Sequence, residues 1–181
     1  MLTGENIRLR PLQFGDENLF FKWRNDLDYI RLTKSVRLPK HQGNEKDWLE
    51  SVMKDKSNRS ITFIIETVSD SESIGFVQLN SMDWISRNCM FGIAITEKNQ
   101  QGKGFGKEVM RLLFKYVFDN LNLLKIGLEV TAFNENSIYL YEKIGFEKEG
   151  ELKKQYFWDG EYHDVYIYGL FKENFVTDES K

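Results

Sequence analysis

Apolar and polar residues alternate in several short runs of this sequence, and between these runs apolar residues recur every three or four positions. Alternation predicts strands, because successive side chains of a strand point to opposite faces, whereas the wider spacing predicts amphipathic helices. The predicted strands cover residues 6–12, 60–67, 73–80, 88–95, 123–132 and 164–171. The predicted helices cover residues 15–26, 44–56, 106–121 and 134–144.

The order of these elements predicts a mixed α/β fold. The polar turn VSDSE joins the second and third strands, which predicts a hairpin, while two strand–helix steps follow later in the chain. We therefore expect one domain over residues 1–175, with a mixed, mostly antiparallel sheet of six to seven strands and helices on both faces. The acidic end, residues 176–181, is expected to be a frayed tail.

Composition and charge narrow the functional classes. Hydrophobic residues make up 41% of the 181 residues, and the net charge is -3 with both signs interspersed. The chain therefore lacks the basic surface typical of nucleic-acid-binding proteins, and its apolar runs are too short to span a bilayer. Cys89 is the single cysteine, which excludes an internal disulfide and a cysteine-built metal site. We expect a cytoplasmic protein that binds no metal, nucleic acid or membrane.

The stretch EKNQQGKGFGKEVM, residues 97–110, places three glycines at alternate positions just before a predicted helix. Free backbone N–H groups at a helix start bind anions, and small residues let a ligand approach the backbone. Two phosphate-binding motifs do not fit: a P-loop needs Ser or Thr where Glu108 stands, and the dinucleotide fingerprint needs another glycine spacing. What remains is Gln-x-x-Gly-x-Gly, which a merely tight turn explains nearly as well.

A second motif, in VTAFNENSIYLYEKIGF at residues 130–146, follows one strand after the glycine helix. Together, Gln/Arg-x-x-Gly-x-Gly/Ala and Asn-x-x-Ser/Ala-x-x-x-Tyr-Glu-Lys-x-Gly-Phe resemble the GNAT superfamily of N-acetyltransferases. The similarity covers nearly the whole chain and is strongest to the branch with ribosomal-protein, polyamine and amino-sugar acetyltransferases. It implies acetyl-CoA as cosubstrate, direct attack of an amine on the thioester, and a central pair of strands that splays to admit the thioester.

The resemblance also implies roles for individual residues. Tyr141 matches the general acid that protonates the departing thiolate, with a pH-rate limb near the ordinary phenol pKa of about 10. The alternative for Tyr141 is a core aromatic. The residues matched to acetyl-CoA binding are Ile93, Ala94, Ile95, Gln101, Gly102, Lys103, Gly104, Phe105, Gly106, Lys107, Asn134, Asn136, Ser137 and Tyr141.

No general base is assigned from the sequence. Relatives often carry an acidic residue where this chain has Met90. Glu129, on the next strand, is either a substitute acting through a water or the partner in a surface ion pair. His41 and His163 stand outside any catalytic constellation, and Cys89 has no histidine or carboxylate in a recognisable relation to it.

The acceptor amine is expected to bind opposite the cofactor, between the first two helices and strand 88–95. The residues proposed for it are Trp23, Arg24, Asn25 and Phe91. The run WRN resembles amino-sugar-nucleotide acetyltransferases, whereas the tail GELKKQYFWDGEYHD resembles the polyamine and ribosomal-protein enzymes. A helix-core role is an equal alternative for Trp23.

Charge decides the preferred acceptor at this point. A polycation would favour clustered carboxylates, but the loop TKSVRLPKHQ supplies Lys34, Arg37 and Lys40. An amino sugar or sugar nucleotide is therefore favoured over a polyamine or a protein N-terminus. The other class of function is a non-catalytic coenzyme A-binding sensor or interaction domain, which the presence of Tyr141 disfavours. A homodimer is possible in either case.

Overall fold

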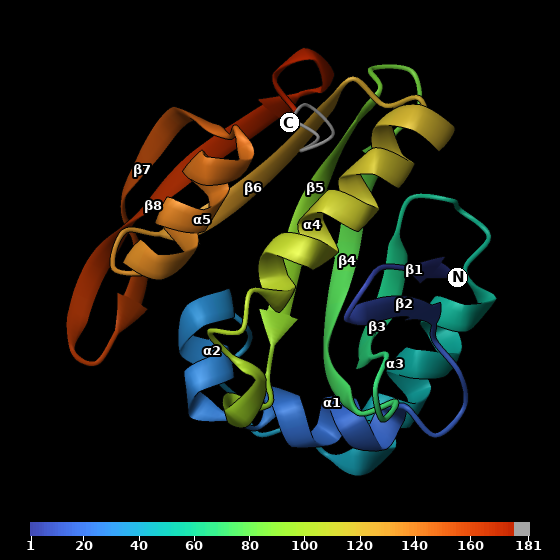
Figure 1. Cartoon of the computed structure of the whole chain (residues 1–181). Helices are drawn as coiled ribbons and strands as arrows, with labels where there is room; N and C mark the ends of the chain where they lie inside the picture. Colours follow the sequence, from blue (N-terminus) through green and yellow to red (C-terminus); the bar gives the residue numbers. More distant parts are fainter. Residues whose placement is uncertain (176–181) are drawn as a thin grey trace.

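The computed structural model describes residues 1–175, and within them eight strands form one sheet in the order β1-β2-β3-β4-β5-β6-β8-β7 (Figure 1). The strands are β1 (Leu2–Thr3), β2 (Ile7–Pro11), β3 (Ile61–Thr67), β4 (Ser73–Asp83), β5 (Asn88–Ile95), β6 (Lys125–Thr131), β7 (Glu147–Trp158) and β8 (Glu161–Phe171). Neighbouring strands pair antiparallel except β5 and β6, which pair parallel. The mixed, mostly antiparallel sheet is confirmed, but it has eight strands where six to seven were expected. The tail expected at 176–181 lies outside the described residues.

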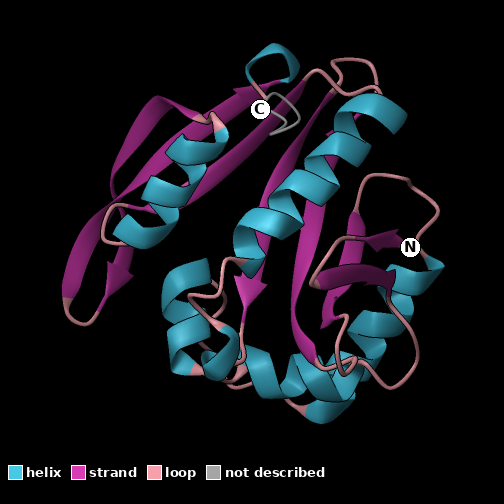
Figure 2. Ribbon diagram, in the orientation of Figure 1, coloured by secondary structure: helices cyan, strands magenta, loops and turns pink. Residues whose placement is uncertain are grey.

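Helices cover both faces of this sheet (Figure 2). The helices are α1 (Glu17–Arg24), α2 (Leu27–Thr33), α3 (Gln42–Lys54), α4 (Phe105–Lys115) and α5 (Glu135–Ile144), and a π-helical turn, Tyr116–Asn120, extends α4. On one face α4 and α5 pack on the main core, to which Val109, Leu113 and Phe114 of α4 contribute. On the other face, Phe20 and Trp23 of α1 pack against Ile64 and Phe76 of the sheet.

Three elements, β1, α2 and β7, are missing from the sequence prediction, and none of them has a clear apolar pattern. In the seven residues of α2 only Ile30 is buried, so no repeat of apolar positions marks the helix. β7 is an edge strand whose side chains are mostly exposed, with Tyr156 as its one buried residue. Hydrogen bonds to β8 hold β7 in the sheet, and its own sequence carries little sign of them.

The parallel pairing of β5 with β6 is short. It ends at the pair Met90–Gly127, and a Cβ on Gly127 would lie 2.9 Å from the Met90 sulfur, so the strands approach closely there. Beyond this pair, residues 91–95 of β5 and 128–131 of β6 move apart, while β5 stays paired with β4 and β6 with β8 (Figure 1). We call these two stretches the divergent segments. They agree with the splayed strand pair that the sequence predicts.

Candidate functional site

The peptide groups of the divergent β5 segment point alternately to its two sides. The Ala94 carbonyl faces β4, because a Cβ on Gly75 would lie 2.0 Å from its oxygen. The Ile95 carbonyl instead accepts a hydrogen bond from Gln101 Nε2 at 2.7 Å. In an antiparallel strand the N–H and C=O of one residue point the same way, and neighbouring residues point oppositely. The N–H groups of Ile93 and Ile95 therefore face the side from which β6 has moved away, whereas Ala94 is used in the ladder with β4.

The glycine loop ends directly at α4, and its three glycines differ in what they do. Gly102 and Gly104 have positive φ angles of 75° and 85°, and a Cβ on either would meet no atom within 4 Å. Gly106 lies in the first turn of α4, where a Cβ would be 3.5 Å from Leu140 of α5. The first two glycines thus allow a left-handed backbone beside open space, and the third lies close to a neighbouring helix.

The backbone donors of this loop remain available for a ligand. The N–H groups of residues 102–106 have no acceptor in the described part of the chain, while Lys107 and Glu108 donate to the Gly104 carbonyl. The Lys103 ammonium donates to Gln100 Oε1 at 2.8 Å. Free N–H groups at a helix start, with open space at Gly102 and Gly104, fit the pyrophosphate of a nucleotide cofactor.

Tyr141, on α5, belongs to the main core and lies beside Phe91 of the divergent β5 segment. Its side chain is 8% exposed and meets Phe91 and Phe146 edge-on or tilted, with ring centroids 6.5 and 5.7 Å away. Burial raises the pKa of Tyr141 to about 12, although a hydrogen bond with Ser137 lowers it in part. Any pH-rate limb that belongs to this phenol is therefore expected near pH 12 and not near pH 10. The hydroxyl keeps its proton at neutral pH, as a proton donor must.

The remaining matched residues lie at the start of α5. Asn134 caps the helix, and its side chain accepts a hydrogen bond from the Ser137 N–H at 3.4 Å. Asn136 is exposed in the first turn. A short turn joins the divergent end of β6, at Thr131, to the start of α5, at Glu135.

The residues expected to bind the acceptor do not form one surface. Trp23 is 1% exposed and donates its indole N–H to Glu97 Oε1 at 3.0 Å, and Phe91 is buried on the other face of the sheet, 4.9 Å from Phe114. Side chains enclosed in two separate apolar clusters cannot jointly contact one ligand. Trp23 lies in the core beneath α1, as the alternative prediction had it.

Arg24 and Asn25 are engaged within the chain. The Arg24 guanidinium lies 3.7 Å from the centroid of Trp48 and pairs with the buried Glu45 at 2.8 Å. Asn25 accepts from the Lys40 N–H at 2.9 Å and donates to backbone carbonyls, so it fastens the loop after α2 to α1. Both residues hold the helices together.

The candidate bases and the cysteine have defined surroundings. Glu129 forms an ion pair with Lys34, and Met90 lies on the facing strand. His41 precedes α3 without a side-chain cap. Burial raises the pKa of the Cys89 thiol to about 12, which disfavours a nucleophilic role.

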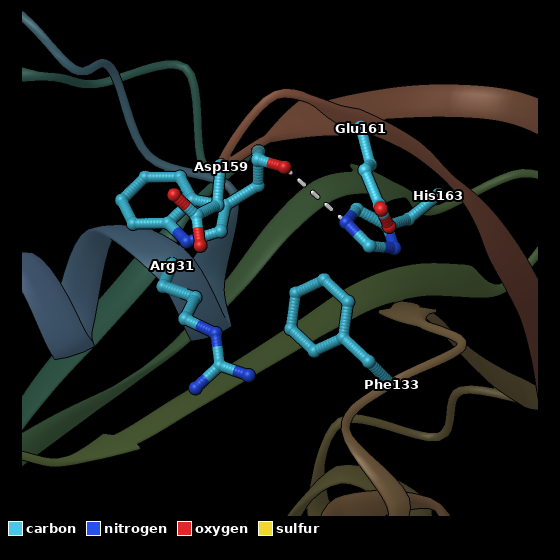
Figure 3. Close-up of a pocket in the computed structure, with 6 residues that line it drawn as sticks. Arg31, Phe133, Asp159, Glu161 and His163 are labelled. Carbon is cyan, nitrogen blue, oxygen red and sulfur yellow. Dashed lines mark hydrogen bonds between the residues drawn. The ribbon is translucent and has the colours of Figure 1, made fainter.

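A cavity of about 280 Å³ lies at the turn between β7 and β8 (Figure 3). The sequence analysis does not predict this cavity. The Arg31 guanidinium is 4.9 Å from the centroid of Phe133, and a ring nitrogen of His163 is 3.4 Å from the Trp158 carbonyl oxygen. The hydroxyl of Tyr156 donates to a carbonyl of α2, which attaches the hairpin to that helix. The residues that line the cavity are Arg31, Phe133, Trp158, Asp159, Glu161 and His163.

Residues 1–175 contain neither a membrane-spanning helix nor a cluster of metal ligands. None of their helices combines the length and apolar character of a membrane span. No group of three or more His, Cys, Asp or Glu side chains is placed to hold a metal ion in this part of the chain.

Comparison with known proteins identifies relatives over most of the chain. The acetyltransferase (GNAT) domain family matches residues 6–147. An uncharacterized, prophage-derived N-acetyltransferase of Bacillus subtilis is 33% identical over 96% of this chain and 94% of its own. Spermidine N(1)-acetyltransferase of Escherichia coli is 29% identical over 98% of this chain and 92% of its own. The crystal structure of spermidine N-acetyltransferase from Vibrio cholerae, in complex with CoA and spermine, superimposes with a TM-score of 0.85 at 28% identity, covering 93% of this chain and 96% of that one.

Proposed function

Because the chain belongs to the acetyltransferase (GNAT) family, we propose that it transfers the acetyl group of acetyl-CoA to a primary amine of a polyamine. The family and its relatives make the chain an acetyl-CoA-dependent N-acetyltransferase acting on a small-molecule amine. The polyamine acceptor, the site residues and a homodimer remain proposals. The observation that carries the choice of acceptor is the likeness to two spermidine acetyltransferases over more than nine-tenths of this chain.

This proposal reverses the preference for an amino sugar. That preference rested on the basic loop after α2, and two of its three cations, Arg37 and Lys34, contact other side chains. The Arg37 guanidinium lies 4.9 Å from the centroid of Tyr156, and the Lys34 ammonium pairs with Glu129. The carboxylate of Glu129 offsets the charge of Lys34, so the loop argues less strongly against a cationic acceptor.

The reaction requires that a neutral amine nitrogen bond to the thioester carbonyl carbon and lose a proton, while the C–S bond breaks and the leaving thiolate gains a proton. We assign the pyrophosphate cradle to the N–H groups of residues 102–106, which have no other acceptor among the described residues. The N–H of Ile93 faces the divergence of the strands and is suited to stabilise the developing oxyanion. The buried hydroxyl of Tyr141 keeps its proton and is suited to donate it to the leaving sulfur.

The proposal is tested by following free thiol release from acetyl-CoA with a panel of amines. The panel contains spermidine, spermine, glucosamine and a short peptide with a free N-terminus. We expect kcat/KM for a polyamine to exceed that for glucosamine by about tenfold or more, which is roughly 1.4 kcal/mol. Reactions without amine give the background of hydrolysis. A higher kcat/KM for glucosamine or for the peptide would refute the polyamine assignment.

A further inference from the structure

We propose that Glu129 binds an ammonium group of the acceptor and that Lys34 occupies the same carboxylate when no acceptor is bound. This inference rests on the proposed function, because it requires a cationic amine as substrate. It names the group that recognises the acceptor's charge and the group that competes with it.

Glu129 lies in the divergent segment of β6, two residues beyond the last parallel pair at Gly127. It pairs with Ile167 of β8 on one side, while β5 has moved away on the other. The adjacent residues Leu128 and Val130 are buried in the main core beneath α4 and α5, so Glu129 points to the opposite face of the sheet. Its side chain is 41% exposed. The carboxylate is thus open to solvent at the opening between the strands, on the face away from α4 and α5.

Lys34 reaches Glu129 from the helix that borders this opening. It is the residue that ends α2, and α2 contacts both β5 and β6. Its backbone is left-handed, with φ 57° and ψ 28°, a conformation in which glycine is the favoured residue at a helix end. Its side chain is only 22% exposed and its ammonium is paired with the Glu129 carboxylate. Lys34 therefore occupies a position where the backbone conformation alone would favour glycine, a residue without a side chain.

The chemistry of the pair resembles the chemistry of the proposed acceptor. A lysine side chain is an ammonium on a four-carbon stem, and a polyamine carries ammonium groups on stems of three or four carbons. Exchange of one ammonium for another leaves Glu129 paired, and an ion pair whose carboxylate is 41% exposed contributes little to stability. The exchange is therefore energetically easy. Met90 on the facing strand brings no charge to compete with it.

The carboxylate of Glu97 is held by more donors than that of Glu129. Glu97, just after β5, accepts from the Lys22 ammonium at 2.6 Å and from the Trp23 indole N–H at 3.0 Å. Two donors from α1 hold that carboxylate, and its side chain is less exposed than that of Glu129. Among the described residues, Glu129 accepts only from the ammonium of Lys34, so it is the carboxylate more readily transferred to a ligand.

Calorimetry with spermidine as the probe tests the competition. We expect Lys34→Met to lower the Kd for spermidine by about two- to fivefold, the range that an exposed ion pair allows. Glu129→Gln should raise the Kd by about tenfold, because a charged partner is lost. In the Glu129→Gln background, Lys34→Met should bring no further gain. The matched control is Lys54→Met, which breaks the ion pair with Glu50 on α3 and removes the same charge. An unchanged Kd in Lys34→Met, or an equal gain in Lys54→Met, would overturn the competition.

A second readout follows Lys34 itself and needs no turnover. Reductive ¹³C-methylation gives each lysine an NMR signal, and Lys34→Arg identifies the one that belongs to Lys34. We expect Glu129→Gln and saturating spermidine to move that signal in the same direction, because both release the ammonium from the carboxylate. Spermidine that binds and is acetylated while the Lys34 signal stays in place overturns this inference alone. Wild-type protein that neither binds nor acetylates spermidine overturns the proposed function and the inference with it.

Discussion

Tyr141 is the residue on which the proposed chemistry depends most directly. Tyr141→Phe removes a hydroxyl whose proposed interaction is made mainly in the transition state. We expect kcat to fall by roughly ten- to a thousandfold, with little change in KM for acetyl-CoA. Because burial raises the pKa of Tyr141 to about 12, the wild-type rate should show no limb from this phenol near pH 10.

Tyr168 provides a matched control for that substitution. Burial also raises the pKa of Tyr168 to about 12, and its hydroxyl donates to Glu142 at 2.9 Å. Tyr168→Phe should keep kcat within about twofold of wild type while losing one hydrogen bond's worth of stability, about 1 kcal/mol. Melting temperatures of both variants separate a kinetic effect from a folding defect. Wild-type turnover in a stable Tyr141→Phe protein would return Tyr141 to the role of a core aromatic.

Gly104 tests the phosphate cradle. A Cβ at this position meets no protein atom within 4 Å, so valine would project into the space assigned to the pyrophosphate. We expect Gly104→Val to abolish measurable coenzyme A binding in calorimetry. The left-handed backbone adds a stability cost of about 1–2 kcal/mol.

Gly160→Val separates these two effects. Gly160 has a φ of 82° and equally open surroundings, but it lies in the turn between β7 and β8. Gly160→Val should lower stability by a similar amount, because its backbone is equally strained, but it should leave the affinity for coenzyme A unchanged. Equal losses of affinity in the two variants, or none in Gly104→Val, would contradict the cradle.

Local motifs predict local geometry, and this explains which residues could be assigned from the sequence. Gly104 belongs to the motif Gln-x-x-Gly-x-Gly and has a positive φ, as does the adjacent loop residue Gly102. Trp23 and Phe91 could not be judged in this way. Whether an aromatic side chain faces a ligand or the core depends on which elements pack against it, and the structure places these two in separate clusters.

At the scale of elements, the Arg24–Glu45 pair joins α1 to α3. Glu45 is 2% exposed, so removal of the guanidinium would leave a buried carboxylate without its partner. We expect Arg24→Met to lower the free energy of unfolding by about 3 kcal/mol in urea titrations. Lys22, also on α1, forms a more exposed ion pair with Glu97, which follows β5. Lys22→Met should therefore lower the free energy of unfolding by less than about 1 kcal/mol. A stable Arg24→Met protein with weakened acceptor binding would instead support the ligand role expected from the sequence.

The ion pairs between β2 and β3 should make stability depend on pH. Burial alone would raise the pKa of Glu66, but hydrogen bonds from Arg10 and Arg8 outweigh it and lower the pKa below the ordinary 4.5. A lowered pKa in the folded state stabilises the protein fully above pH 4.5, and this stabilisation is lost as the pH falls through the folded value. Urea unfolding between pH 7 and 3 should show this loss, and Glu66→Gln should flatten it. An identical pH profile in that variant would assign the dependence to other groups.

Elements with a buried face were predictable, and those held by their neighbours were not. The strand predicted at 88–95 has the bounds of β5, because both of its faces carry apolar residues. The polar edge strand β7 and the short helix α2 owe their existence to β8 and to the hairpin that contacts α2. Such partners are distant in the sequence, so the local pattern carries no trace of them.

At the scale of the whole molecule, the sheet consists of two parts that meet only at the short parallel ladder between β5 and β6. One part is β1 to β5 and the other is β6, β8 and β7. Three residue pairs, Asn88–Met90 with Lys125–Gly127, join them within the described sheet. The strands on either side keep their other partners along their full divergent segments. The opening is therefore a property of the topology and persists without distortion of either part.

The alternation of peptide groups along the divergent part of β5 should be visible as a difference in time. Amide protons of Gly92 and Ala94, bonded into the ladder with β4, should exchange with deuterium slowly, whereas those of Ile93 and Ile95 should exchange much faster. The amide protons along this one strand would then exchange alternately slowly and fast. Coenzyme A seated between the strands should slow the fast amides toward the slow ones. Uniform exchange along residues 91–95, with or without coenzyme A, would contradict this.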